Sequence, residues 1–413
     1  MNHFHLRRGA LHCEDVPLER LAREVGTPTY VYSTATLVRH LTVLQQAFAQ
    51  TPALLCYSVK ASSNLAILKL LADRGAGFDI VSAGELGRVV EAGGEPRRVV
   101  FSGVGKRDDE LELALLLGIL QFNVESAEEL SRLDAVARRL KMRAPFALRV
   151  NPGVDAKTHR YIATALKTSK FGVPFEEAVG LYKKSRQMKG LLARGLDCHI
   201  GSQLTDTRPV REAIGKVADL YRGLQRLGLP LTHLDVGGGL GVTYTTERPP
   251  GLEEYARAVR EPLRGLDATL VLEPGRVLVG NAGVLLTRVV YRKKTPARRF
   301  LIVDAGMNDL LRPALYEAHH EVRPVRPRKG ARSKWDVVGP VCESSDVLGH
   351  QRAFPPLSPG DCLAVMTAGA YGMSMASTYN SRPRPAEVLV DGSRYRVVRA
   401  RETLEDLWRG ETP

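Results

Sequence analysis

The strongest constraint on the fold is a regular alternation of strand-like and helix-like segments between residues 33 and 280. Short apolar runs rich in β-branched and aromatic residues recur, and helical stretches or loops with helical stretches separate them. Parallel strands need long crossovers of this kind, and eight of them in about 250 residues are typical of a (β/α)8 barrel. The expected strands are Leu54–Val59, Gly77–Val81, Arg98–Phe101, Leu120–Val124, Phe146–Val150, Gly195–Ile200, Leu231–Val236 and Thr269–Leu272.

The pattern changes after Gly283, where Gly and Pro break short strand-like runs and no long amphipathic helix recurs before the tail. We therefore expect a barrel domain at residues 33–280 and a β-rich barrel or sandwich formed by residues 281–413 with residues 1–32. Residues 4–32 carry strand-like segments, the clearest at Gly26–Tyr32, without a helix followed by a strand. The later runs are Val284–Tyr291, Phe300–Asp304, Trp335–Val338, Asp361–Met366, Glu387–Asp391 and Tyr395–Arg399.

The distribution of charge along the chain indicates which kinds of molecule the protein can bind. The formal net charge is +14, but Lys and Arg alternate with Asp and Glu along most of the sequence. The dense basic run Arg323–Lys334 contains Pro and Gly, as a solvated loop does. Because no patterned basic stripe is present, we expect no nucleic-acid partner. Excess positive charge also suits an enzyme with an anionic cofactor and an anionic substrate.

Hydropathy and cysteine content indicate a cytoplasmic protein. No apolar run approaches the roughly 18 residues of a membrane span, and Met1–Gly9 lacks the apolar region of a secretory signal. The five cysteines are an odd number without a C-x-x-C pair, which argues against a disulfide framework or a zinc site. We expect reduced thiols, no metal and no membrane contact.

Lys60 follows the first expected barrel strand, and a helical pattern starts near Asn64. A lysine at the carboxyl end of a barrel strand faces the mouth where such folds place their active sites. Desolvation or cationic neighbours there can lower the pKa of an amine until it acts as a nucleophile. A lone lysine is more often a solvated surface residue, so other motifs must support this interpretation.

Two loops supply that support. Asp235–Gly241 follows the seventh strand and contains three consecutive glycines, and Glu273–Arg276 (EPGR) follows the eighth. In such barrels these two loops often bind phosphate. The glycine loop alone would equally suggest a tight turn or a dinucleotide motif, but the latter needs a strand ending in an acid about 20 residues on. Glu253 and Glu254 lie instead in a helical stretch. A phosphate cradle facing a strand-end lysine is what pyridoxal phosphate requires.

Seven motifs then carry a resemblance that covers nearly the whole chain. The sequence resembles the diaminopimelate decarboxylases, a family of pyridoxal-phosphate enzymes with an alanine-racemase-like barrel. The motifs are Tyr57–Ala61, His199–Gln203, Gly237–Gly239, Glu273–Arg276, Arg312–Tyr316, Cys342–Asp346 and Gly369–Gly372.

The resemblance implies how the cofactor would be held. Lys60 would bind it covalently, and Glu273 would keep the pyridine nitrogen protonated, so that the ring accepts electrons well. Racemases of this fold place an arginine at that position. His199 would stack on the ring and Asp79 would lie near Lys60, although a lone histidine is more often a core residue. The residues expected around the phosphate are Ser202, Gly238, Gly275, Arg276 and Tyr371.

The resemblance also implies that the chain forms a homodimer, and it indicates the substrate. Cys342 would be the general acid, and with Glu343 it would reach into the active site of the neighbouring subunit. Related ornithine and arginine decarboxylases carry an aspartate beside the cysteine, whereas Glu343 here would meet a distal ammonium group. The guanidinium groups of Arg276 and Arg312 would bind a distal carboxylate through paired hydrogen bonds. The substrate would be meso-diaminopimelate, converted to L-lysine and CO2 in the last step of lysine biosynthesis. The expected substrate-binding residues are Arg276, Arg312, Tyr316, Glu343 and Tyr371.

Two other functions are compatible with parts of the pattern. A related decarboxylase could act on a carboxylated polyamine, and a non-catalytic barrel could bind the cofactor or a partner. The presence of both Lys60 and Cys342 argues against the non-catalytic barrel. Small departures from the family pattern are Ser58 and Ser62 near the lysine and Ala165 in the loop at residues 159–167.

Overall fold

The computed structural model describes residues 2–154 and 170–413, so the predicted loop with Ala165 lies outside the described residues. The chain divides into two compact units. The barrel unit comprises Leu41–Val242 and Arg248–Gly275, and the β unit comprises Met1–His40, Thr243–Glu247 and Arg276–Pro413. The domain limits expected near residues 33 and 280 stay predictions.

Eight parallel strands form the closed barrel, as the alternation of segments predicts. Each strand pairs in parallel with the next one around the barrel, and the pairing of Leu270 with Ala53 closes the ring. All eight expected strands are confirmed, with shifts of a few residues at their ends. They are β5 (Ala53–Ser58), β6 (Gly77–Ile80), β7 (Val99–Phe101), β8 (Gln121–Val124), β9 (Ala144–Asn151), β11 (Leu191–Cys198), β12 (His233–Asp235) and β13 (Thr269–Leu272).

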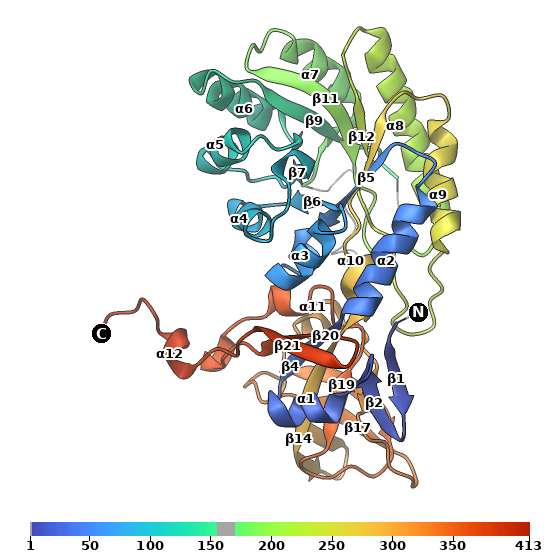
Figure 1. Cartoon of the computed structure of the whole chain (residues 1–413), viewed down its shortest axis with the longest axis vertical. Coiled ribbons are helices and arrows are strands. Elements are labelled where there is room, and N and C mark those ends of the chain that lie inside the picture. The colour runs from blue at the N-terminus through green and yellow to red at the C-terminus, as the bar shows by residue number, and fades with distance from the viewer. Residues whose placement is uncertain (1, 155–169) are drawn as a thin grey trace. The chain divides into compact units, whose positions relative to one another are not determined.

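Helices surround these strands on the outside (Figure 1). Several begin at side-chain caps that the sequence supplies: Asn64 accepts the N–H of Ala66 at 2.9 Å, and Ser126 accepts the N–H of Glu129 at 3.0 Å. No helix in the described parts of the chain is long and apolar enough to cross a membrane. The helices are α2 (Thr34–Ala47), α3 (Leu65–Ala72), α4 (Ala83–Glu91), α5 (Asp108–Leu116), α6 (Ala127–Arg139), α7 (Ala178–Ser185), α8 (Arg208–Arg226) and α9 (Leu252–Arg260).

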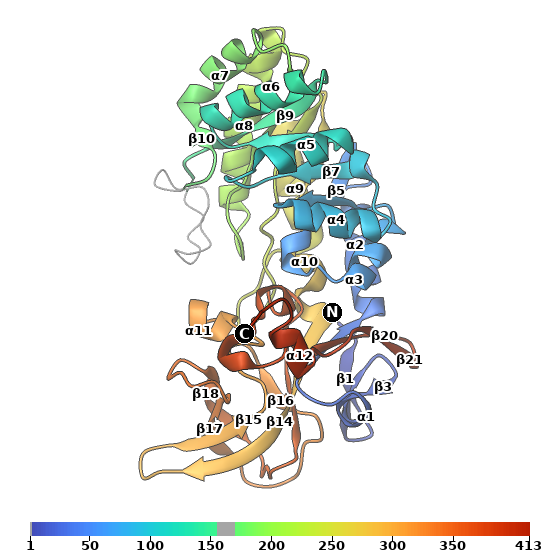
Figure 2. The same ribbon diagram turned by 90° about the vertical axis from the view of Figure 1, so that its left-hand side faces the viewer.

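The β unit contains a sheet in the order β18-β17-β15-β14-β4-β20-β21, with the long strand β14 at its centre (Figure 2). The N-terminal segment contributes β4 between β14 and β20, as expected. Short helices α10 (Arg276–Val279), α11 (Arg312–Tyr316) and α12 (Leu404–Leu407) accompany the strands. The strands are β4 (Thr29–Ser33), β14 (Gly283–Lys294), β15 (Arg299–Val303), β16 (Val322–Pro324), β17 (Ser333–Val338), β18 (Val347–Phe354), β19 (Cys362–Val365), β20 (Ala386–Asp391) and β21 (Arg394–Arg399).

Three details differ from the expectation. Helix α1 (Leu18–Glu24) precedes β4, although no helix was expected there, and β1 (Phe4–Arg7), β2 (Ala10–Cys13) and β3 (Val16–Pro17) form a separate small sheet. Strands β16 and β18 were not expected. The basic run is not entirely a loop, because its first two residues end β16 and its last two residues begin β17.

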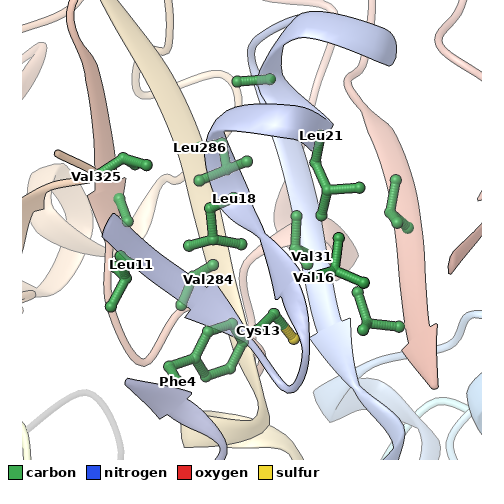
Figure 3. Close-up of a cluster of buried hydrophobic side chains, with 14 of the residues drawn as sticks. Phe4, Leu11, Cys13, Val16, Leu18, Leu21, Val31, Val284, Leu286 and Val325 are labelled. Atoms are coloured by element: carbon green, nitrogen blue, oxygen red, sulfur yellow. The ribbon is translucent and has the colours of Figure 1, made fainter. Parts of the chain in front are cut away.

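One buried cluster joins the N-terminal segment to the central strands of this unit (Figure 3). Phe4, Leu11 and Leu18 pack with Val284 and Leu286 of β14, and all five are at least nine-tenths buried. Burying such side chains stabilises a fold by about 1.5 to 3 kcal/mol each. The N-terminal segment therefore contributes several buried side chains to the core of the β unit.

Candidate active site

Lys60 lies in a single turn, Val59–Ala61, directly after β5, which is the strand end that the sequence predicts. Its Nζ forms an ion pair with the Oδ2 atom of Asp79, a fully buried residue of β6. Ser58 Oγ donates to the same Oδ2 atom at 2.8 Å and lies 3.1 Å from the carbonyl oxygen of Glu273. Burial and Glu273 raise the pKa of Asp79 to about 6, and Lys60 opposes that rise. The structure thus brings Lys60 and Asp79 together, and Ser58 joins them.

Glu273 follows β13 directly, and its carboxylate contacts Nε2 of His199, which follows β11. Burial alone would raise the pKa of Glu273, but the charges of His199 and Lys60 lower it to about 2. Burial opposes protonation of His199, yet Glu273 and Asp197 raise the pKa of the imidazole to about 9. Asp197 Oδ1 lies 3.2 Å from Nδ1 of the ring. At neutral pH, Glu273 and His199 are therefore an ion pair.

A polar network that no sequence motif indicated lies around Glu273. The Asn123 amide nitrogen lies 3.1 Å from Ser102 Oγ, 3.2 Å from Asp235 Oδ2 and 3.3 Å from Glu273 Oε1. Burial and the charge of Glu273 raise the pKa of Asp235 well above its ordinary value. Of these two neighbouring carboxyl groups, Glu273 therefore has the lower pKa and Asp235 the higher one. A polar residue on a strand with both faces buried, such as Asn123, is the sequence signal that could have identified the network.

The glycine loop packs closely against two other loops of the barrel unit. A Cβ atom on Gly238 would clash with the Glu273 carbonyl oxygen, and one on Gly239 would clash with the Gly201 carbonyl oxygen. Gly239 also has a φ of +107°, which side chains disfavour. A Cβ atom on Gly275 would lie 3.1 Å from the Ser58 Cβ atom. The loops that carry Ser202, Gly238 and Gly275 can approach their neighbours this closely because Gly238, Gly239 and Gly275 lack side chains.

In the β unit, Arg276 and Arg312 lie around the ring of Tyr244. Their guanidinium carbons are 5.8 Å and 4.7 Å from its centroid, and Arg276 Nη1 donates to the Tyr244 hydroxyl at 2.8 Å. The ring of Tyr371 lies 5.0 Å from the Arg276 guanidinium carbon. Tyr316 ends the helix that Arg312 begins. The structure therefore groups Arg276, Arg312 and Tyr371, and adds Tyr244, which no motif indicated.

Cys342 and Glu343 lie in the turn between β17 and β18, and the Cys342 residue is exposed in the single chain. The backbone N–H of Cys342 donates to Asn380 Oδ1 at 2.8 Å. The Tyr379 hydroxyl donates to the carboxylate of Glu343. Tyr379 and Asn380, which no sequence motif indicated, thus hold the turn in place, and Cys342 itself is exposed.

The residues of the barrel unit fit pyridoxal phosphate. They provide an amine at a strand end, an ionised carboxylate of low pKa, an imidazole, and loops whose backbone can close on a phosphate. Asp197, His199 and Glu273 also bring one potential ligand atom each within 4.8 Å of the others, a spacing that a metal ion could use. Because Glu273 and His199 already neutralise each other, the cofactor explains the arrangement better.

Comparisons with known proteins agree with this chemistry. Residues 34–280 match the family model described as the pyridoxal-binding domain of pyridoxal-dependent decarboxylases. A diaminopimelate decarboxylase of Pseudomonas aeruginosa is 52% identical over 412 residues, which cover 100% of this chain and 99% of the relative. The structure of diaminopimelate decarboxylase from Helicobacter pylori with L-lysine has a TM-score of 0.92 at 47% identity, covering 95% of this chain and 98% of that chain. The M. jannaschii enzyme with L-lysine has a TM-score of 0.95 at 36% identity, covering 100% and 99%.

Proposed function

The chain belongs to the pyridoxal-dependent decarboxylases, in the diaminopimelate decarboxylase family, and from this we propose that it converts meso-diaminopimelate to L-lysine and CO2. It is a pyridoxal-phosphate-dependent carboxy-lyase of lysine biosynthesis. The observation that carries the proposal is the placement of Lys60, Asp79, His199 and Glu273 at neighbouring strand ends of the barrel. Two diaminopimelate decarboxylases that resemble this chain have structures with bound L-lysine, which supports the choice of product.

When bound, the cofactor supplies an acceptor for the electron pair that remains on the substrate when CO2 leaves. Lys60 would hold the cofactor covalently, and Asp79 keeps the Lys60 amine in place at the end of β5. Glu273, ionised because of His199, would provide the negative charge that holds a proton on the ring nitrogen. His199 would support the face of the ring. Ser202, Gly238, Gly275, Arg276 and Tyr371 would bind the phosphate.

The remaining expected site residues concern the substrate. Arg276 and Arg312 would bind the carboxylate that is retained, with Tyr316 and Tyr371 as hydroxyl partners. Glu343 would bind the distal ammonium group, and the Cys342 thiol would return a proton to the carbon that lost CO2. We propose that the enzyme is a cytoplasmic homodimer in which Cys342 and Glu343 serve the partner's site. The exposure of Cys342 in the single chain supports this proposal.

The test is CO2 release from meso-diaminopimelate, L-lysine, ornithine and arginine under identical conditions. We expect activity with meso-diaminopimelate alone, with L-lysine formed in equal amount, and no activity in Lys60→Ala. Preference for ornithine, arginine or a carboxylated polyamine would contradict the substrate. Inactivity of cofactor-loaded protein on all substrates would favour a non-catalytic barrel.

A further inference from the structure

Arg312 is held in the β unit by a neutral histidine. Arg312 Nη1 lies 2.8 Å from Nε2 of His320, and the Nδ1 atom of His320 lies 2.9 Å from the carbonyl oxygen of Met366. A carbonyl oxygen only accepts hydrogen bonds, so Nδ1 carries the ring proton and Nε2 keeps the lone pair that accepts from Arg312. Both side chains are more than nine-tenths buried. One tautomer of a neutral imidazole is therefore fixed.

The surroundings keep His320 neutral. Burial and the charge of Arg312 lower the pKa of the imidazole to about 3. The Tyr244 ring packs edge-on against the imidazole, with the two ring centroids 5.3 Å apart. Through the neutral pH range, His320 is an uncharged acceptor.

The charge of Arg312 is not cancelled by its protein contacts. Its second hydrogen-bond partner is the Tyr244 hydroxyl, which is not a carboxylate. Across residues 2–154 and 170–413, no carboxylate forms an ion pair with Arg312. Burial and the nearby Arg276 both lower the pKa of Arg312, but a guanidinium stays protonated in proteins. Burying such a charge is costly, and an incoming carboxylate offsets the cost through charge-assisted hydrogen bonds.

We infer that His320 is a positioning residue that determines specificity, because it holds the Arg312 guanidinium in place without neutralising the charge that binds the substrate's retained carboxylate. The inference rests on the proposed function, in which Arg312 meets that carboxylate. A carboxylate at position 320 would hold Arg312 equally well in space, but it would compete with the substrate for the same charge. The neutrality of the acceptor is thus the property that matters.

Two substitutions of His320 by residues of equal size distinguish the effect of charge from the effect of packing. His320→Gln keeps a neutral acceptor and His320→Glu supplies an anionic one. The probes are L-lysine, which has the retained carboxylate, and 1,5-diaminopentane, which lacks it. Their dissociation constants for the holoenzyme are measured by titration calorimetry, with KM and kcat determined in parallel and thermal unfolding as a control for folding.

We expect the wild type and His320→Gln to bind L-lysine more tightly than 1,5-diaminopentane. In His320→Glu, the dissociation constant of L-lysine should rise by on the order of tenfold or more, which corresponds to about 1.4 kcal/mol, while that of 1,5-diaminopentane stays within twofold or falls. KM should rise more than kcat falls. His320→Leu, which removes the acceptor, should also weaken L-lysine binding selectively, and it keeps the test informative if the Glu variant does not fold.

Equal effects of Gln and Glu on L-lysine, or unchanged L-lysine binding in the Leu variant, would overturn the role of His320 and leave the proposed function intact. A wild type that binds both probes equally would contradict the proposed carboxylate recognition by Arg312, and the inference would fall with it. The two failures are therefore distinguishable.

Discussion

The carboxylate of Glu273 and the imidazole of His199 form a largely buried ion pair at the carboxyl ends of β13 and β11. Each group shifts the pKa of the other: Glu273 is lowered to about 2 despite its burial, and His199 is raised to about 9 despite its burial. A carboxylate kept ionised by a cation beside it suits a partner for a protonated ring nitrogen. The pair also makes stability depend on pH.

Stability should fall at alkaline pH because of His199. Its pKa in the folded state, about 9, exceeds the ordinary value of 6.5, so its stabilising contribution is complete below pH 6.5 and lost as pH rises through 9. We expect the free energy of unfolding of the wild type to exceed that of His199→Gln by at most about 3 kcal/mol at pH 6.5, with the difference vanishing above pH 9. Denaturant unfolding of both proteins across this range measures it. A difference independent of pH would contradict the ion pair.

Ser58→Ala should change the titration of the site without abolishing activity. The Ser58 hydroxyl donates to Asp79, so its loss should raise the pKa of Asp79 above about 6 and move the acid limb of the pH–rate profile upward. The lost hydrogen bond should cost about 1 kcal/mol of stability. Ser62→Ala is the matched control, since the Ser62 hydroxyl has no hydrogen-bond partner in the described structure. Identical pH profiles for all three proteins would show that Ser58 does not influence Asp79.

Metal removal should leave the enzyme unchanged. Asp197, His199 and Glu273 are close enough to bind an ion, but the pairing of His199 with Glu273 explains their proximity. We expect prolonged dialysis of the holoenzyme against a chelator to alter neither cofactor content nor CO2 release. Activity that disappears on chelation and returns with zinc would instead identify a metal site.

Mixed dimers should reveal whether sites are shared. A heterodimer of Lys60→Ala and Cys342→Ala subunits would contain one site with both groups, and about half of the wild-type activity is expected by symmetry. The control places both substitutions in one subunit and pairs it with a wild-type subunit. Shared sites predict that this second heterodimer is inactive, whereas independent sites predict the reverse pattern.

The barrel could be predicted from sequence because each of its strands is a short apolar run between helical stretches. Strand β18 escaped prediction since Gly349, His350, Gln351 and Arg352 interrupt its apolar pattern, and α1 is only two turns long. The tertiary structure of the β unit compensates for these weak local signals. Strand β18 is held by pairing with β17, and α1 by packing its leucines in the core of the unit.

The main site residues could be predicted for a related reason. Lys60 and Glu273 follow strands directly, and parallel strands bring such positions to one end of a barrel. Asn123 could have been noticed as a polar residue on a buried strand, although its partners could not be read from the pattern. Tyr244 and Asn380 could not be predicted, because their roles depend on partners 32 and 38 residues away in the chain. His320 lies only eight residues after Arg312, but no local pattern marks a histidine as an acceptor for a particular arginine.

Borohydride reduction of the holoenzyme, followed by peptide mapping, shows whether Lys60 holds the cofactor. Reduction makes the bond between cofactor and lysine permanent. We expect the label on the peptide that contains Lys60, and no label in the cofactor-treated Lys60→Ala variant. A label on another lysine, or equal labelling of the variant, would contradict it.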